Sequence, residues 1–159
     1  MNLYHGTNAD FNAVSLSFSK DKRDFGKGFY TTMYKEQADS WSKIICFRFR
    51  GLTRYVYEFE LNITNDLKVK HFETMNNEWL EFVGKNRIMG GIQHNFDIVI
   101  GPVANDNTSR TIELYVDGIY SADVALQKLR YFKTNNQVSI HTEAALRALK
   151  LINRDSYEK

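Results

Sequence analysis

One short segment, residues 55–61, constrains the fold more than any other part of this chain. Its sequence, Tyr-Val-Tyr-Glu-Phe-Glu-Leu, alternates and is rich in aromatic and β-branched residues. Alternation places successive side chains on opposite faces of a strand, so the segment is predicted to form a half-buried strand. Asn65 and Asp66 follow it and are predicted to end it, because both residue types favour turns.

Strands and helices are predicted to be interspersed along the rest of the chain. Ala38, Trp41 and Ile45, for example, follow the spacing of one helix face. The predicted strands cover residues 2–5, 29–32, 55–61, 96–100 and 138–141, and the predicted helices cover residues 34–42, 73–86, 121–130 and 143–152. One proline and nine scattered glycines leave no obvious linker or repeat. We therefore expect a single domain of the α+β class over residues 1–159.

Composition limits the cellular compartment and the ligands that are expected for this protein. The lone cysteine, Cys46, rules out an internal disulfide and, between Ile45 and Phe47, is predicted to be buried and reduced. No apolar stretch approaches the roughly 18 residues of a membrane span, and the chain begins with a strand rather than a signal segment, so we expect a cytoplasmic protein. A net charge of +2 neither demands nor excludes nucleic acid. The histidines lack the spacing of a metal site, so no metal is expected.

Two motifs near the start of the chain carry most of the chemical information. They are Leu3-Tyr4-His5-Gly6-Thr7 and Asp24-Phe25-Gly26-Lys27-Gly28-Phe29-Tyr30-Thr31-Thr32. Together they resemble the first two NAD-binding elements of ADP-ribosyltransferases, in the branch that includes diphtheria toxin and the poly-ADP-ribose polymerases. The resemblance extends through residues 97–106 and 135–139 to a little-characterised bacterial, toxin-like family of these enzymes. It implies a split, mostly antiparallel β-core with flanking helices, and NAD as co-substrate.

The resemblance gives four motif residues roles in NAD binding. His5 would hold the nicotinamide ribose, since a neutral imidazole offers one donor and one acceptor. Gly6 would present backbone polar groups to the nicotinamide carboxamide, and its missing Cβ would allow a close approach. Tyr30 is expected to stack on the nicotinamide ring. Gly28 would let the glycine-rich loop lie close to the ligand.

Three further residues have supporting roles in this hypothesis. Thr7 is expected to support His5 through its hydroxyl. Trp41 lies eleven residues after Tyr30 and is a candidate for the opposite wall of the nicotinamide slot, with a core-facing position as the alternative. Lys27 either approaches phosphates or is a solvated loop lysine.

The third motif departs from the pattern of the resembled enzymes. They usually place a Glu at the start of a late strand, where it stabilises the developing positive charge of the ribose. In this chain Gln137 takes that position, and its amide can orient a ribose but supplies no charge. Three interpretations remain open: Gln137 suffices for transfer of one ADP-ribose, Asp106 or Glu143 supplies the carboxylate, or the domain binds NAD without turnover.

The leading hypothesis is therefore an NAD-dependent mono-ADP-ribosyltransferase, toxin-like, with a protein, a nucleic acid or a small molecule as acceptor. By analogy, a separately encoded antitoxin could neutralise it. The alternatives are a catalytically degenerate NAD-binding module and an RNA 2′-phosphotransferase-like enzyme. A further pattern is relevant to nucleic-acid binding. Basic and aromatic residues alternate in it, namely Phe47, Arg48, Phe49, Arg50, Arg54 and Tyr55. Either these residues form a basic aromatic surface for nucleic acid, or they belong to a strand with one solvated face.

Overall fold

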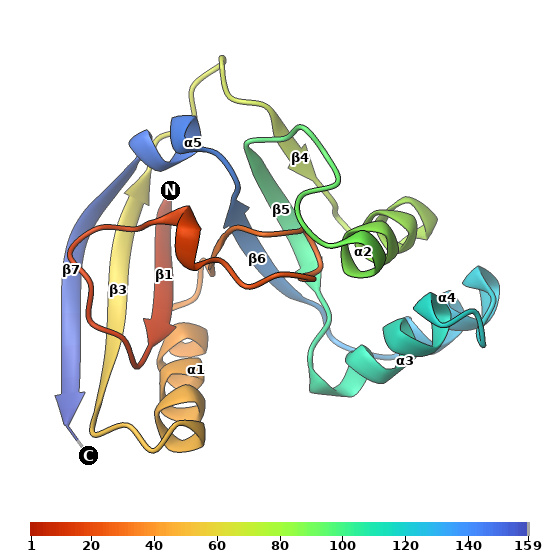
Figure 1. Cartoon of the computed structure of the whole chain (residues 1–159), viewed down its shortest axis with the longest axis horizontal. Coiled ribbons are helices and arrows are strands. Elements are labelled where there is room, and N and C mark those ends of the chain that lie inside the picture. Colours follow the sequence, from red (N-terminus) through yellow and green to blue (C-terminus); the bar gives the residue numbers. More distant parts are fainter. Residues whose placement is uncertain (159) are drawn as a thin grey trace.

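Two β-sheets form the framework of the protein, whose computed structural model describes residues 1–158. The first sheet has the order β1 (Asn2–Thr7), β3 (Thr53–Leu61), β7 (Leu149–Glu158), and both of its pairings are antiparallel. The second has the order β2 (Phe29–Thr31), β6 (Asn135–Ile140), β5 (Ile98–Val103), β4 (Val69–His71), with a parallel pairing only between β4 and β5. Figure 1 shows the first sheet beside the second. The predicted α+β class with mostly antiparallel sheets is confirmed.

The two sheets meet between β1 and β2 at one residue pair. The N–H of Tyr4 donates to the carbonyl oxygen of Thr32 at 2.7 Å, and the N–H of Thr32 donates to that of Tyr4 at 2.9 Å. No further ladder joins β1 to β2 within residues 1–158. The β-core is therefore split immediately after Tyr4.

Five α-helices lie within residues 1–158 and pack on the sheets or on one another. Helix α1 (Lys35–Arg48) packs on β1 and β3, and its buried residues Ala38, Ser42, Ile45 and Cys46 fall on one face at helical spacing. Helices α2 (Asn77–Met89), α3 (Asp106–Val116) and α4 (Ala122–Leu129) contact one another on the far side of the second sheet (Figure 1). The short α5 (Glu143–Arg147) leads into β7. All helices within residues 1–158 are too short or too polar to span a membrane.

Two hydrophobic cores hold these layers together. One lies between the second sheet and helices α2 to α4, and centres on Trp79, whose indole N–H donates to the carbonyl oxygen of Pro102 at 2.7 Å. The other lies between the two sheets and includes Leu3, Tyr57, Phe59, Leu61, Ile98, Val138 and Ile140. Cys46 is buried as predicted, and its thiol contacts the carbonyl oxygen of Gly51.

The predicted helix over residues 143–152 is wrong in its second half. The helix ends at Arg147, and residues 149–158 form β7, an edge strand of the first sheet. Leu149 and Ile152 have helical spacing relative to Leu146, but pairing with β3 along its whole length outweighs that local signal. Ile152 is half exposed rather than buried. Helix α3 and strand β4 were not predicted.

Candidate functional site

The split between β1 and β2 leaves two backbone polar groups of Gly6 without a strand partner. Alternate residues of a strand direct their N–H and C=O groups to opposite edges. Tyr4 directs its groups to β2, so Gly6, two residues later, points to the same edge. None of the hydrogen bonds within residues 1–158 occupies the Gly6 groups on that edge. Gly6 is buried, and buried backbone groups require a partner, so this donor and acceptor pair suits a bound ligand.

His5 lies beside this split with one nitrogen occupied. Its Nδ1 lies 2.8 Å from the carbonyl oxygen of Tyr30, and because that oxygen only accepts, Nδ1 carries the proton. Burial lowers the pKa of His5 below its ordinary value, so the ring is neutral at pH 7. The ring packs against Phe29, with centroids 4.5 Å apart. Nε2 is then an acceptor without a hydrogen bond among the described residues, open to a ligand hydroxyl.

Gly6 is a glycine for a reason that the sequence did not reveal. Its missing side chain faces α1, where a Cβ would lie 1.9 Å from the carbonyl oxygen of Ala38. Close packing of the helix on the strand, rather than access for a ligand, therefore requires glycine here. His5, the neighbouring residue, faces the opposite side of β1, as strand alternation demands.

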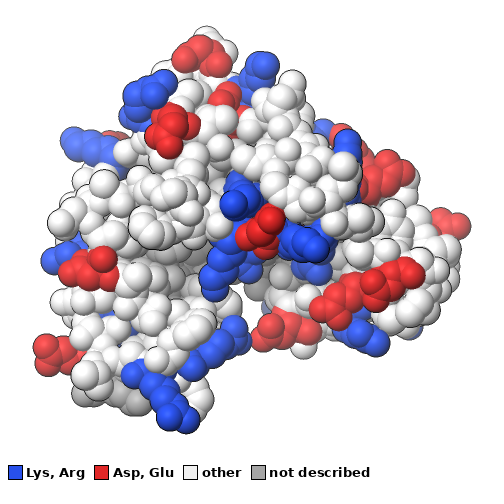
Figure 2. Space-filling model, in the orientation of Figure 1, with Lys and Arg blue, Asp and Glu red and all other residues white. Residues whose placement is uncertain are grey.

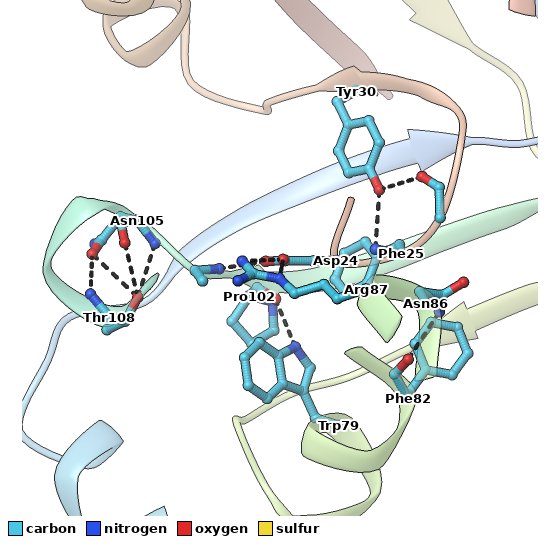
Figure 3. Close-up of polar contacts among 12 residues, drawn as sticks. Asp24, Phe25, Tyr30, Trp79, Phe82, Asn86, Arg87, Pro102, Asn105 and Thr108 are labelled. Carbon is cyan, nitrogen blue, oxygen red and sulfur yellow. Dashed lines mark hydrogen bonds and ion pairs between the residues drawn. The ribbon is translucent and has the colours of Figure 1, made fainter. Parts of the chain in front are cut away.

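Tyr30 is half buried on β2, and its hydroxyl is fully used by the preceding loop. The hydroxyl donates to the carbonyl oxygen of Gly26 at 2.8 Å and accepts from the N–H of Phe25 at 3.0 Å (Figure 3). Burial raises the pKa of this hydroxyl, which keeps it a neutral donor. The Arg23 guanidinium lies 5.7 Å from the ring centroid. A ligand stacked on this ring would share its surroundings with a cation.

The loop before Tyr30 is anchored by an ion pair that sequence reasoning missed. Asp24 is 7% exposed, and its Oδ1 accepts from Nε and Nη2 of Arg87 on α2 at 2.7 and 2.6 Å (Figure 3). Its second oxygen accepts from the N–H of Ala104 at 2.6 Å. The loop thereby connects β5 with α2 and is held in place. Asp24 was visible in the motif, but no spacing rule points to an arginine 63 residues away.

Two histidines, the buried His141 and the partly buried His94, complete the anchoring of this loop. Nδ1 of His141 donates to the carbonyl oxygen of Lys27 at 2.7 Å, and Nε2 of His94 donates to that of Phe25 at 2.8 Å. Burial lowers the pKa of His141 to about 4, so it is neutral. Gly28 passes so close to His141 that a Cβ would lie 2.7 Å from Nδ1. Within residues 1–158, no three His, Cys, Asp or Glu residues are grouped so that they could hold a metal ion.

The three predicted supporting residues have the following positions. The hydroxyl of Thr7 accepts from the N–H of Ala9 at 3.1 Å and does not bond His5, so the predicted support is wrong. Trp41 is 40% exposed on α1 and belongs to neither core, which rules out its core-facing alternative. It follows Ala38, the contact of Gly6, by about one helical turn. Lys27 is a solvent-exposed loop lysine.

Gln137 lies on the same face of the second sheet as Tyr30. Tyr30 pairs with Ser139, so Gln137 is its diagonal neighbour, with Cβ atoms about 7–8 Å apart at usual sheet geometry. Its half-buried amide makes no hydrogen bond among the described residues. Asp106 begins α3, just beyond the strand residue that pairs with Asn135, and is exposed at the same end of the sheet. Glu143 begins α5, beyond the opposite end of β6.

Two surface grooves lie away from these residues. One, of about 790 Å³, is lined by α3 and α4, and the other, of about 470 Å³, is lined by α2 and the end of α3. Neither contains a residue of the two motifs. The candidate site is therefore defined by the strand split, and neither of these grooves belongs to it.

Comparison with known protein families gives a match over most of the chain. A family model described as "Protein of unknown function (DUF3990)" matches residues 1–151. No curated protein and no solved structure gives a significant match.

Proposed function

We propose that this chain, which belongs to the DUF3990 family, is an NAD-dependent mono-ADP-ribosyltransferase. The observation that carries the proposal is the free N–H and C=O of Gly6 at the split between β1 and β2. A carboxamide presents one C=O acceptor and an NH₂ donor, so nicotinamide matches this pair with two hydrogen bonds. The site would thereby hold the leaving group of the reaction in a fixed orientation.

The residues around Gly6 suit the remaining parts of the substrate. The free Nε2 of His5 can accept from a ribose hydroxyl, and its neutral ring adds no positive charge near the reacting carbon. Aromatic surface is supplied by Tyr30 and by the half-exposed Trp41. The loop of residues 20–27 supplies cations that can pair with the pyrophosphate. These are Lys20, Lys22, Arg23 and Lys27, and none of them forms a salt bridge within residues 1–158.

The proposed reaction breaks the bond between nicotinamide and ribose. Both bonding electrons leave with nicotinamide, and the ribose carbon passes through a state that resembles an oxocarbenium ion, as in glycoside cleavage. An acceptor nucleophile then bonds that carbon and loses its proton. Gln137 orients the ribose by its amide, while the rigid backbone of Gly6 keeps the leaving group aligned.

The absence of a carboxylate at Gln137 supports a second candidate function, which is binding of NAD without turnover. An amide offers polar stabilisation but no negative charge to the developing cation. Asp106 is the better placed of the two carboxylates considered, because it lies at the Gln137 end of the sheet. The toxin-like role and a separately encoded antitoxin remain part of the proposal by resemblance alone.

The test is incubation of the purified protein with NAD labelled in its ADP-ribose part, with and without cell extract. Label on a macromolecule is expected for a transferase. Release of free nicotinamide without label transfer would indicate a glycohydrolase, and calorimetric binding without either product would indicate a sensor. No binding of NAD by the folded protein would contradict the proposal in all its forms.

A further inference from the structure

The end of α1 carries a solvent-exposed patch of aromatic and basic side chains. Phe47 is 78% exposed and Phe49 is 58% exposed, although rings of this size are usually buried. Arg48 and Arg50 alternate with them and are exposed as well. Lys20, from the loop before the glycine-rich motif, places its Nζ 5.8 Å from the centroid of Phe49. We define these five residues as the α1-end patch.

The fold separates this patch from the strand with which its sequence is continuous. Helix α1 ends at Arg48, and Arg50 adopts a left-handed backbone conformation with φ of 53° that turns the chain toward β3. Arg54 lies on the strand and is already engaged, bonding Asp39 at 2.5 Å and packing 4.0 Å from the ring of Tyr157. The interleaved pattern is therefore not the solvated face of one strand. Residues 47–50 instead form a solvent-exposed surface at the end of α1.

Few acidic residues lie near the patch along the chain, and the exposed Asp21, next to Lys20, is one of them. The sequence contains no Asp or Glu between Asp39 and Glu58. In the neighbouring loop, the exposed Asp21 accepts from the N–H of Gly91 at 2.7 Å, and the buried Asp24 pairs with Arg87 on α2. The basic residues of that loop keep their charges free of salt bridges within residues 1–158, and they are Lys20, Lys22, Arg23 and Lys27. Figure 2 shows Lys and Arg side chains gathered beside the hollow between the two halves of the molecule.

The patch is continuous with the candidate site in two ways. Along the loop, Lys20 contacts Phe49 and Arg23 lies over Tyr30. Along the helix, Ala38 faces Gly6, and the guanidinium of Arg48 lies 6.0 Å from the ring of Trp41. Eleven residues of helix separate Ala38 from Phe49, which is about 16 Å at 1.5 Å per residue. A polymer bound to the patch can therefore reach the site.

We propose that the α1-end patch binds single-stranded nucleic acid. Exposed rings between cations are what this ligand requires, since bases stack on the rings and phosphates pair with the cations. A line of cations without salt bridges among the described residues continues from the patch along the loop to Tyr30, and it matches a flexible polyanion. A protein that binds a membrane surface presents a wide apolar face bordered by cations. Here Arg48 lies in sequence between the rings of Phe47 and Phe49, so the apolar surface is interrupted. If the proposed function holds, the bound strand is the acceptor of ADP-ribose, and this clause alone rests on that function.

Binding is measured by fluorescence anisotropy with a labelled 15-nucleotide RNA, the same sequence as DNA, and the matching duplex. Both single strands are expected to bind more tightly than the duplex, whose bases are not free to stack. The double change Phe47→Ala with Phe49→Ala should weaken single-strand binding about tenfold or more. The matched control is Tyr131→Ala, which removes a ring that is 82% exposed elsewhere, and it should leave affinity unchanged.

A second pair of variants tests the charges. Arg48→Gln with Arg50→Gln should reduce the slope of log affinity against log salt by about 1.4, or 0.7 for each lost phosphate contact. Lys85→Gln, an exposed lysine on α2, should not change that slope. Phe49→Trp keeps a stacking face and should retain binding, which separates stacking from mere structural damage.

Three results would overturn the proposal. They are no oligonucleotide binding at low salt, binding that both double variants leave unchanged, and patch-dependent binding to anionic phospholipid vesicles in place of oligonucleotides. Calorimetry with NAD on the same variants separates this outcome from failure of the proposed function. Oligonucleotide binding without NAD binding would contradict the proposed enzyme and support the nucleic-acid surface. NAD binding without oligonucleotide binding would contradict the nucleic-acid surface alone.

Discussion

The Nδ1–H of His5 donates a 2.8 Å hydrogen bond to the main-chain oxygen of Tyr30 across the split between β1 and β2. This bond ties the first motif to the second, although 25 residues separate them in sequence. It also sets the orientation of the imidazole, so that the acceptor nitrogen is turned away from β2. The bond therefore joins the two motifs through the backbone of Tyr30, while the ring of His5 packs on Phe29, which alternates with Tyr30 on β2.

Substitutions of Tyr30 should separate its ring from its hydroxyl. Tyr30→Ala removes the aromatic face and should weaken NAD binding by about tenfold, from about 1 kcal/mol of lost stacking and the lost contact area. Tyr30→Phe keeps the ring but leaves the N–H of Phe25 and the C=O of Gly26 unpaired, so it should cost about 1–3 kcal/mol of folding stability. Calorimetry and urea unfolding measure the two effects. Unchanged affinity in both Tyr30→Ala and His5→Ala would remove these residues from the site.

Gln137 decides between turnover and binding alone. Gln137→Ala should lower the rate of NAD cleavage more than NAD affinity, because the ion-like sugar depends more on polar stabilisation than the ground state does. Gln137→Glu should preserve or raise the rate, since it places negative charge where positive charge develops. Nicotinamide release measures both. If Gln137→Ala turns over normally while Asp106→Ala is inactive, the carboxylate is supplied by α3.

Acid should destabilise the protein through His141. The unfolded chain binds a proton near pH 6.5 that folded His141 accepts only near its pKa of about 4, so protonation favours the unfolded state between these values. Lowering the pH from 7 to 5 should therefore cost about 2 kcal/mol through this residue alone. His5 and His94 act in the same direction, because burial lowers their pKa as well.

The check is urea unfolding of the wild type and His141→Asn at both pH values. Asparagine retains a donor for the carbonyl oxygen of Lys27 but does not titrate. The variant should be less sensitive to acid by about 2 kcal/mol. An equal loss of stability in both proteins would show that His141 is not the titrating group.

Gly6→Ala should disrupt the contact between β1 and α1. The added Cβ would overlap backbone rather than a flexible side chain, so the helix must move, and we expect a loss of about 3 kcal/mol or more. Gly84→Ala is the matched control, since its Cβ would meet only the ring of Tyr115 at 3.1 Å and gains helix propensity. Thermal unfolding compares the two. A Gly6→Ala protein as stable as the wild type would contradict the packing.

The sequence predicted correctly those helices and strands whose hydrophobic spacing matches the face that they bury in the fold. The alternating segment became β3, and the face of Ala38 and Ile45 became α1. β7 was missed because its lone partner strand lies some 90 residues earlier and local spacing favoured a helix. α3 was missed because it begins in a polar run, Asn105-Asp106-Asn107, which is typical of a turn, whereas Asn105 caps the helix by accepting from the N–H groups of Asn107 and Thr108.

The same distinction holds at the site. The two sequence motifs predicted His5, Gly6 and Tyr30 as site residues, and the fold places their backbones at the split between β1 and β2. The partners that hold the loop in place, Arg87 and His141, come from distant segments. Their importance depends on burial in three dimensions, and no periodicity or spacing in a single sequence carries that information.

The order in which the strands join has a consequence for when activity begins. β6 stands between β2 and β5, and β7 completes the sheet that carries β1, so neither sheet is complete before residues 135–158 have been synthesised. The split strands, by contrast, are made among the first 32 residues. During translation β1 can pair with β3 once residue 61 has been made, whereas β2 lacks its partner β6 until residues 135–140 have been made. If the protein consumes NAD, a ribosome still making it carries no active copy, and the first turnover must wait for the last strands to dock.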